Sequence, residues 1–129
     1  MSALGVRNDA LCTFAGLVPK GSLRDKILVM HNYIVNASVQ IVPIVADKHP
    51  YEWVDEAIDV IKHSGIKYEV GPFATVIEGK YDEVMKMIND VNEYLYSKGC
   101  NEWISNVQIQ IRSHGDITSE EKTEKFKHP

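Results

Sequence analysis

The chain has 129 residues, of which 44% are hydrophobic and 25% are charged. These values are ordinary for one folded globular domain and exclude a disordered or fibrous protein. Lysine and arginine number 14 against 18 aspartates and glutamates, and no basic run occurs, so we expect no nucleic-acid partner. No apolar stretch reaches the roughly 18 residues of a membrane helix, so we expect no membrane partner. The two cysteines, Cys12 and Cys100, have no metal-binding spacing, which favours reduced thiols and a cytoplasmic location.

Residues 1–29 show no sustained period of 2 or 3.6, and Pro19 and Gly21 interrupt them. We interpret them as an N-terminal extension that is flexible or not native to the protein, and place the folded domain at residues 30–129. Three origins remain open. The segment is a genuine extension, the remnant of an engineered cleavage linker, or the product of translation from upstream of a true start at Met30.

The next elements in the chain are a strand and a helix. Residues 37–45 are rich in β-branched side chains and predict a strand. Because proline has no amide hydrogen to donate, this strand should end, bulge or meet an unpaired edge at Pro43. Pro50 suits the first turn of a helix, and Gly65 suits its end. The expected buried stripe of this helix consists of Val54, Ala57, Ile58 and Ile61.

A hairpin and a second helix follow. Residues 66–70 and 73–78 predict two short strands joined at a Gly-Pro turn. Residues 81–97 predict a helix that Gly99 ends, because apolar side chains recur at helical spacing. These side chains are Val84, Met87, Ile88, Val91 and Leu95.

The last predicted strand, residues 103–112, alternates between the apolar Val107, Ile109 and Ile111 and a polar opposite face. Thr118 and Glu121 form a T-x-x-E capping box that starts a short helix at residues 119–127. The order β-α-β-β-α-β predicts an α+β, ferredoxin-like antiparallel sheet with two helices on one face, followed by a short C-terminal helix. The face without helices is lined by amides, which suggests a subunit interface, a ligand floor or both.

No constellation of catalytic residues is visible, so we expect no enzyme, no metal site and no cofactor. The histidines have no ligand spacing, and no glycine-rich phosphate loop occurs. Glu78 lies at a strand end, where its charge must be exposed, paired or used on a ligand. Thr75 is either a strand former in the sheet or a ligand residue. In a regular strand the two point to opposite faces, so both serve one site only through a bulge or a subunit boundary.

The string KYEVGPFATVIEG, residues 67–79, resembles the YkoF-like thiamine-binding protein family. Residues 38–43, 81–85 and 115–122 agree with the same family, and the likeness runs from Asn32 to Phe126. The resemblance implies a homo-oligomer, a dimer or dimer of dimers (homotetramer), that pairs sheets across subunits. It also implies binding of thiamine (vitamin B1) or its hydroxymethyl-pyrimidine part near the interface, without catalysis.

Carried over by position, the expected ligand residues are Ser38, Gln40, Tyr68, Thr75 and Glu78. Gln40, Thr75 and Glu78 can hydrogen-bond a pyrimidine, and Tyr68, Phe73 or Trp103 can supply an aromatic wall. Two alternatives remain open. One is an oligomeric interaction module with no small-molecule ligand. The other is an enzyme acting on a thiamine precursor, which would need an acid-base pair that the sequence does not reveal.

Overall fold

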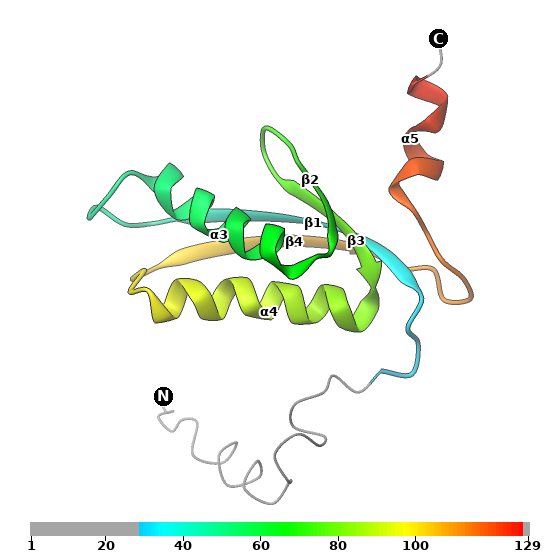
Figure 1. Ribbon diagram of the computed structural model, residues 1–129, viewed down its shortest axis with the longest axis horizontal. Coiled ribbons are helices and arrows are strands. Elements are labelled where there is room, and N and C mark those ends of the chain that lie inside the picture. Colours follow the sequence, from blue (N-terminus) through cyan, green and yellow to red (C-terminus); the bar gives the residue numbers. More distant parts are fainter. Residues whose placement is uncertain (1–28, 128–129) are drawn as a thin grey trace, which may run out of the picture. The chain divides into compact units, whose positions relative to one another are not determined.

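The computed structural model describes residues 29–127, and the expectations for residues 1–28, including those for Cys12, lie outside them. Four strands form one antiparallel sheet in the order β2-β3-β1-β4, with α3 and α4 on one face (Figure 1). The ferredoxin-like α+β fold expected from the sequence is therefore confirmed. The elements are β1 (Ile34–Pro43), α3 (Pro50–Ser64), β2 (Lys67–Val70), β3 (Thr75–Lys80), α4 (Tyr81–Ser97), β4 (Trp103–Gln110) and α5 (Ser119–Lys127).

Helix α3 begins and ends at the expected residues, but its buried stripe differs. The His49 side chain accepts a hydrogen bond from the Tyr51 main chain at 3.1 Å, and Gly65 ends the helix in the left-handed conformation with φ of 84°. The buried side chains are Trp53, Ala57 and Ile61, so the helix is rotated from the stripe that the sequence suggested. Burying the large indole of Trp53 leaves Val54 and Ile58 only partly covered.

Strand boundaries differ from the prediction in all four strands, by one residue at the start of β2 and by more in the others. Strand β1 begins at Ile34 rather than residue 37, because its first residues pair with the end of β3. Strand β3 is Thr75–Lys80 rather than 73–78, because Gly71 donates a hydrogen bond to the Ala74 carbonyl at 2.9 Å and so keeps residues 72–74 in the turn. Strand β4 ends at Gln110, which leaves Ile111 outside the sheet and exposed.

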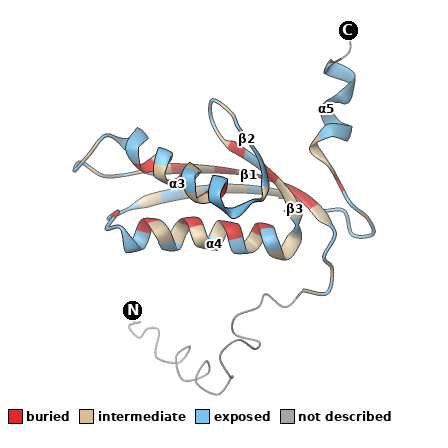
Figure 2. Ribbon diagram, in the orientation of Figure 1, coloured by how far each residue is buried: buried red, intermediate tan, exposed pale blue. Residues whose placement is uncertain are grey.

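The core lies between the sheet and the two helices. Figure 2 shows buried residues along β1, β3 and the sheet-facing side of α4. Ile77, Val84 and Leu95 are fully buried there, and Cys100 closes one end as a free thiol whose pKa is raised by burial. Within residues 29–127 no helix is long and apolar enough to cross a membrane.

Helix α5 follows the predicted capping box, since the Glu121 main-chain nitrogen donates to the Thr118 hydroxyl at 3.3 Å. None of the residues of α5 is buried. The preceding Ile117 is buried and its main-chain nitrogen donates to the Ile34 carbonyl at 3.0 Å. This apolar anchor and a few polar contacts therefore hold the C-terminal segment against the sheet.

Candidate functional site

The sheet face opposite α3 and α4, which we call the open face, is lined mainly by polar side chains. The strand pairing is regular, so alternate residues of each strand lie on it. Gln40 on β1 accepts a hydrogen bond from Asn106 on β4 at 3.1 Å. The other open-face residues are Ile34, Asn36, Ser38 and Val42 on β1, Lys67 and Glu69 on β2, Val76, Glu78 and Lys80 on β3, and Ile104, Gln108 and Gln110 on β4.

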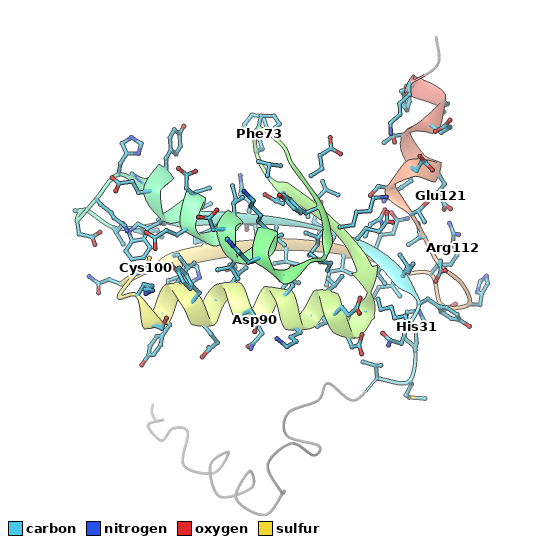
Figure 3. The ribbon with its side chains drawn as sticks, viewed as in Figure 1. His31, Phe73, Asp90, Cys100, Arg112 and Glu121 are labelled. Carbon is cyan, nitrogen blue, oxygen red and sulfur yellow. The ribbon has the colours of Figure 1, made fainter. Side chains whose placement is uncertain are left out.

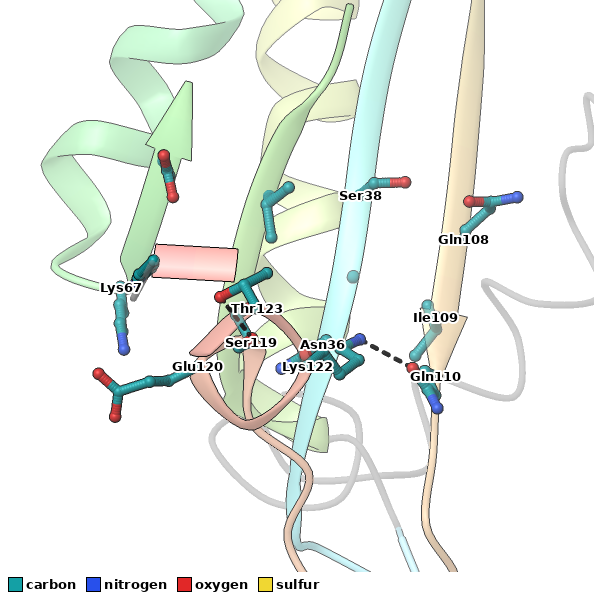
Figure 4. Close-up of a pocket in the computed structure, with 14 residues that line it drawn as sticks. Asn36, Ser38, Lys67, Gln108, Ile109, Gln110, Ser119, Glu120, Lys122 and Thr123 are labelled. Carbon is teal, nitrogen blue, oxygen red and sulfur yellow. Dashed lines mark hydrogen bonds between the residues drawn. The ribbon is translucent and has the colours of Figure 1, made fainter. Parts of the chain in front are cut away.

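A hollow of about 850 Å³, the sheet hollow, lies between the open face and α5 (Figure 4). Ser38 and Gln108 form part of its floor, and Ser119 and Thr123 of α5 form part of its wall. Lys122 spans it by donating to the Gln110 amide oxygen at 2.8 Å. Its charged lining residues carry both signs and are Lys67, Glu69, Glu120, Lys122 and Lys127.

Glu78 joins the sheet to α5. Its Oε1 accepts a hydrogen bond at 2.8 Å from the Ser119 main-chain nitrogen, and its Oε2 lies 3.5 Å from the Lys67 ammonium. Burial acts to raise the pKa of Glu78, but the hydrogen bond from Ser119 and the charge of Lys67 outweigh it and hold the pKa below its ordinary value. The carboxylate is therefore ionised at neutral pH and already has structural partners.

Asn36 lies beside Glu78 and lines the sheet hollow. It is only 4% exposed, and its amide nitrogen donates to the Ile117 carbonyl at 3.1 Å and weakly to Glu78 at 3.5 Å. Its Oδ1 is buried without a hydrogen-bond partner among the described residues. Asn36 was not among the expected site residues, because it precedes the segment predicted as a strand.

A second, smaller hollow of about 300 Å³ lies on the other side of the sheet, between α3 and the turn that joins β2 to β3. We call it the helix hollow. Phe73 stands at the tip of the turn (Figure 3). The lining residues are Val39, Gln40, Ile41, Tyr51, Val54, Ala57, Ile58, Ile61 and residues 71–75. Because the Gln40 side chain lies on the open face, Gln40 borders this hollow through its main chain.

The five expected ligand residues do not meet in one place. Ser38, Gln40 and Glu78 have their side chains on the open face, whereas Thr75 and Tyr68 lie on the helix side of the sheet. Thr75 lines the helix hollow, and Tyr68 borders neither hollow. The regular β1–β3 pairing contains no bulge, so the opposed orientation of Thr75 and Glu78 is as the sequence predicted.

Two aromatic candidates have different surroundings. The Trp103 indole nitrogen donates to Asn92 on α4 at 2.9 Å, so this ring is engaged between the sheet and the helix. Phe73 is exposed and free to contact a ligand at the mouth of the helix hollow. Among residues 29–127 no group of three histidine, cysteine or carboxylate side chains is placed to hold a metal ion.

Comparison with known proteins decides the family. Residues 37–127 match the family model described as thiamine-binding protein. The chain belongs to this family. A UPF0045 protein of Clostridium perfringens is 38% identical over 92 residues, which are 71% of this chain and 96% of the relative.

Solved structures of similar proteins have the same fold as this member of the thiamine-binding protein family. A domain of unknown function from Bacillus cereus superimposes with a TM-score of 0.69 at 32% identity, over 74% of this chain and 91% of the other. A candidate thiamine biosynthesis or salvage protein of Thermotoga maritima gives a TM-score of 0.66 at 35% identity, over 72% and 98% of the two chains.

Proposed function

We propose that this chain binds thiamine or its hydroxymethyl-pyrimidine part and leaves it chemically unchanged. One observation carries the proposal. Residues 67–79, the segment that resembles the thiamine-binding proteins most specifically, contribute to both hollows. Lys67, Glu69 and Val76 line the sheet hollow, and residues 71–75 line the helix hollow. Family membership and the description of the Thermotoga maritima relative support the same ligand class.

Ser38, Gln40, Tyr68, Thr75 and Glu78 remain the proposed ligand contacts, divided between the two sides of the sheet. A ligand held by one chain alone can contact only the residues on one side of the sheet. A second chain is needed to bring residues from both sides to one site. We therefore propose a cytoplasmic homo-oligomer, a dimer or a dimer of dimers, in which another copy covers the open face. The exposed amides of Asn106 and Gln108 would then find hydrogen-bond partners across the interface.

Binding without catalysis agrees with the chemistry of Glu78. It is the one proposed contact with a carboxylate, and its lowered pKa makes it a weak proton acceptor at neutral pH. Its Oε1 accepts a hydrogen bond from the Ser119 main-chain nitrogen and its Oε2 pairs with the Lys67 ammonium, so both oxygens already have structural partners.

Titration calorimetry of the full chain with thiamine, thiamine phosphates and hydroxymethyl-pyrimidine tests the proposal. We expect a dissociation constant in the micromolar range or below for at least one of them, and recovery of the ligand unchanged by mass spectrometry. Absence of heat with all of these compounds would overturn ligand binding. Appearance of a modified product that Glu78→Gln abolishes would overturn the non-enzymatic assignment.

The open face favours one other candidate, an oligomeric interaction module without a small-molecule ligand. Its amide-lined strands can pair with a second copy whether or not a ligand is present. Light scattering coupled to size exclusion separates the two functions when it is combined with the titration. An oligomer that gives no heat with any thiamine compound selects the interaction module.

A further inference from the structure

We propose that the helix hollow is the pocket for one uncharged planar heterocycle. Resting on the proposed function, this assigns the pyrimidine ring of thiamine to the helix hollow and leaves the thiazolium ring at its mouth. The pocket lies on the side of the sheet away from the open face, so the ligand and a second subunit need not compete for the same side chains. The argument uses the chemistry of the lining, its volume and its rim.

The lining of the helix hollow suits a neutral ring. Apolar side chains from β1 and α3 form most of it, and none of its lining side chains is charged. Burying a permanent positive charge against such a lining would be costly, whereas a neutral ring gains from leaving water. The aminopyrimidine ring is neutral at pH 7, and the thiazolium ring is a permanent cation.

Thr75 supplies the polar contact that would orient the ring. It is 4% exposed and lines the hollow. A threonine hydroxyl both donates and accepts, so it can bond a ring nitrogen or an exocyclic amino group. A pocket that is mostly apolar with one placed polar group is typical of small-molecule sites.

The volume of the hollow sets the size of the ligand. At about 300 Å³ it is at the lower end of the range for small-molecule pockets. One substituted ring fits such a space, but the two linked rings of thiamine do not both enter it. The sheet hollow, at about 850 Å³ and with five charged lining residues, is wide and polar by comparison and does not enclose a single neutral ring.

Two exposed aromatic side chains stand at the rim. Tyr51 lies in the first turn of α3 and is 73% exposed, and Phe73 at the tip of the hairpin is 83% exposed. Both line the hollow, although they lie on different elements. Exposed aromatic faces attract cations, so a thiazolium ring that follows the pyrimidine outward would meet them. Phe73 should therefore matter more for thiamine than for the pyrimidine alone.

Variant affinities for thiamine and hydroxymethyl-pyrimidine test this assignment. Thr75→Val keeps the volume and removes the hydroxyl, and we expect it to weaken both ligands about tenfold. Phe73→Ala should weaken thiamine about threefold and the pyrimidine less. The matched controls are Glu120→Gln in the sheet hollow and Tyr96→Ala, an aromatic residue on α4 that is 75% exposed. Neither control should change affinity by more than twofold.

Because Thr75 is buried, the circular dichroism and melting temperature of each variant are measured first. If Thr75→Val does not fold, Phe73→Ala still tests the assignment, because Phe73 is exposed. Amide resonances of Gly71 and of residues 73–75 should shift on ligand addition. Shifts confined to the open face, or loss of affinity in Glu120→Gln but not in Phe73→Ala, would overturn the pocket assignment while thiamine binding stands. If the unmodified chain binds neither thiamine nor hydroxymethyl-pyrimidine, both the proposed function and the pocket assignment are overturned. That result requires no variant.

Discussion

Glu78 on β3 and Ser119 at the start of α5 are joined by a hydrogen bond of 2.8 Å from the Ser119 main-chain nitrogen to the Glu78 carboxylate. A negative charge is thereby placed at the amino end of a helix, where it is favourable. Because no residue of α5 is buried, this bond and those of Lys122 and Arg112 position the helix over the sheet hollow. A residue expected to bind ligand thus also shapes the wall of the hollow.

Replacing Glu78 with glutamine should loosen α5. The neutral amide is a weaker acceptor than the carboxylate and does not pair with Lys67, so we expect a loss of about 1 kcal/mol in the docking of α5. Hydrogen exchange of residues 119–127 should become faster while exchange in β1 and β3 is unchanged. The control is Glu69→Gln, at an exposed position of β2 on the same face of the sheet as Glu78. This variant should leave the hydrogen exchange of residues 119–127 unchanged.

Acid should release α5 from the sheet in the unmodified protein. The folded pKa of Glu78 is lowered, so its contribution to stability is present above the unfolded value of about 4.3 and is lost as the pH falls through the folded value. Protection factors of α5 amides measured from pH 7 down to pH 3 should therefore fall below about pH 4. The fall should be absent in Glu78→Gln, and an equal fall in that variant would show that another group is responsible.

A second carboxylate beside Glu78 should destabilise the domain. In the unmodified protein, the buried side-chain amide nitrogen of Asn36 lies 3.5 Å from the Glu78 carboxylate. The Asn36→Asp substitution would place a second negative charge at this buried position. We expect the free energy of unfolding to fall by about 2–4 kcal/mol at pH 7, and by less in acid as the pair takes up a proton. Asn106→Asp, at an exposed position of the same face, should change it by less than about 0.5 kcal/mol in urea denaturation.

Gly71 keeps the β2–β3 turn tight at the edge of the helix hollow. A Cβ atom at this residue would lie 2.9 Å from the Ala74 carbonyl oxygen, which is main chain and cannot turn away. Gly71→Ala should therefore shift the turn, lower stability by about 1–2 kcal/mol and reduce the thermal shift given by hydroxymethyl-pyrimidine. Gly115→Ala, where the nearest atom is 3.9 Å away, is the matched control and should keep the full thermal shift.

Ile77 tests which face of β3 is the core. It is fully buried between the sheet and the helices, so Ile77→Ala should cost about 2–5 kcal/mol of unfolding free energy. The adjacent Val76 lies on the open face and is partly exposed, so Val76→Ala should cost less than about 1 kcal/mol in the same denaturant titration. Similar losses for both residues would indicate that the open face is covered by another chain in solution.

The amino-acid sequence alone was enough to predict the element types, the hairpin and the two helices on one face of the sheet. Each of these predictions depends on local periodicity and on the positions of glycine and proline. The alternation of β4 and the capping box of α5 are patterns within a few residues of one another. The string at residues 67–79 was likewise sufficient for the family, which the family match confirms.

Tertiary structure alone decided where those elements meet. The contact between Glu78 and Ser119 joins residues 41 apart in the chain, and no local period records it. The burial of Trp53 in place of Val54 depends on the space that α4 and β1 leave, and that rotation leaves Val54 at the edge of the helix hollow. Which hollows exist, and which side of the sheet each expected residue serves, follows from packing between distant segments rather than from the order of residues within any one of them.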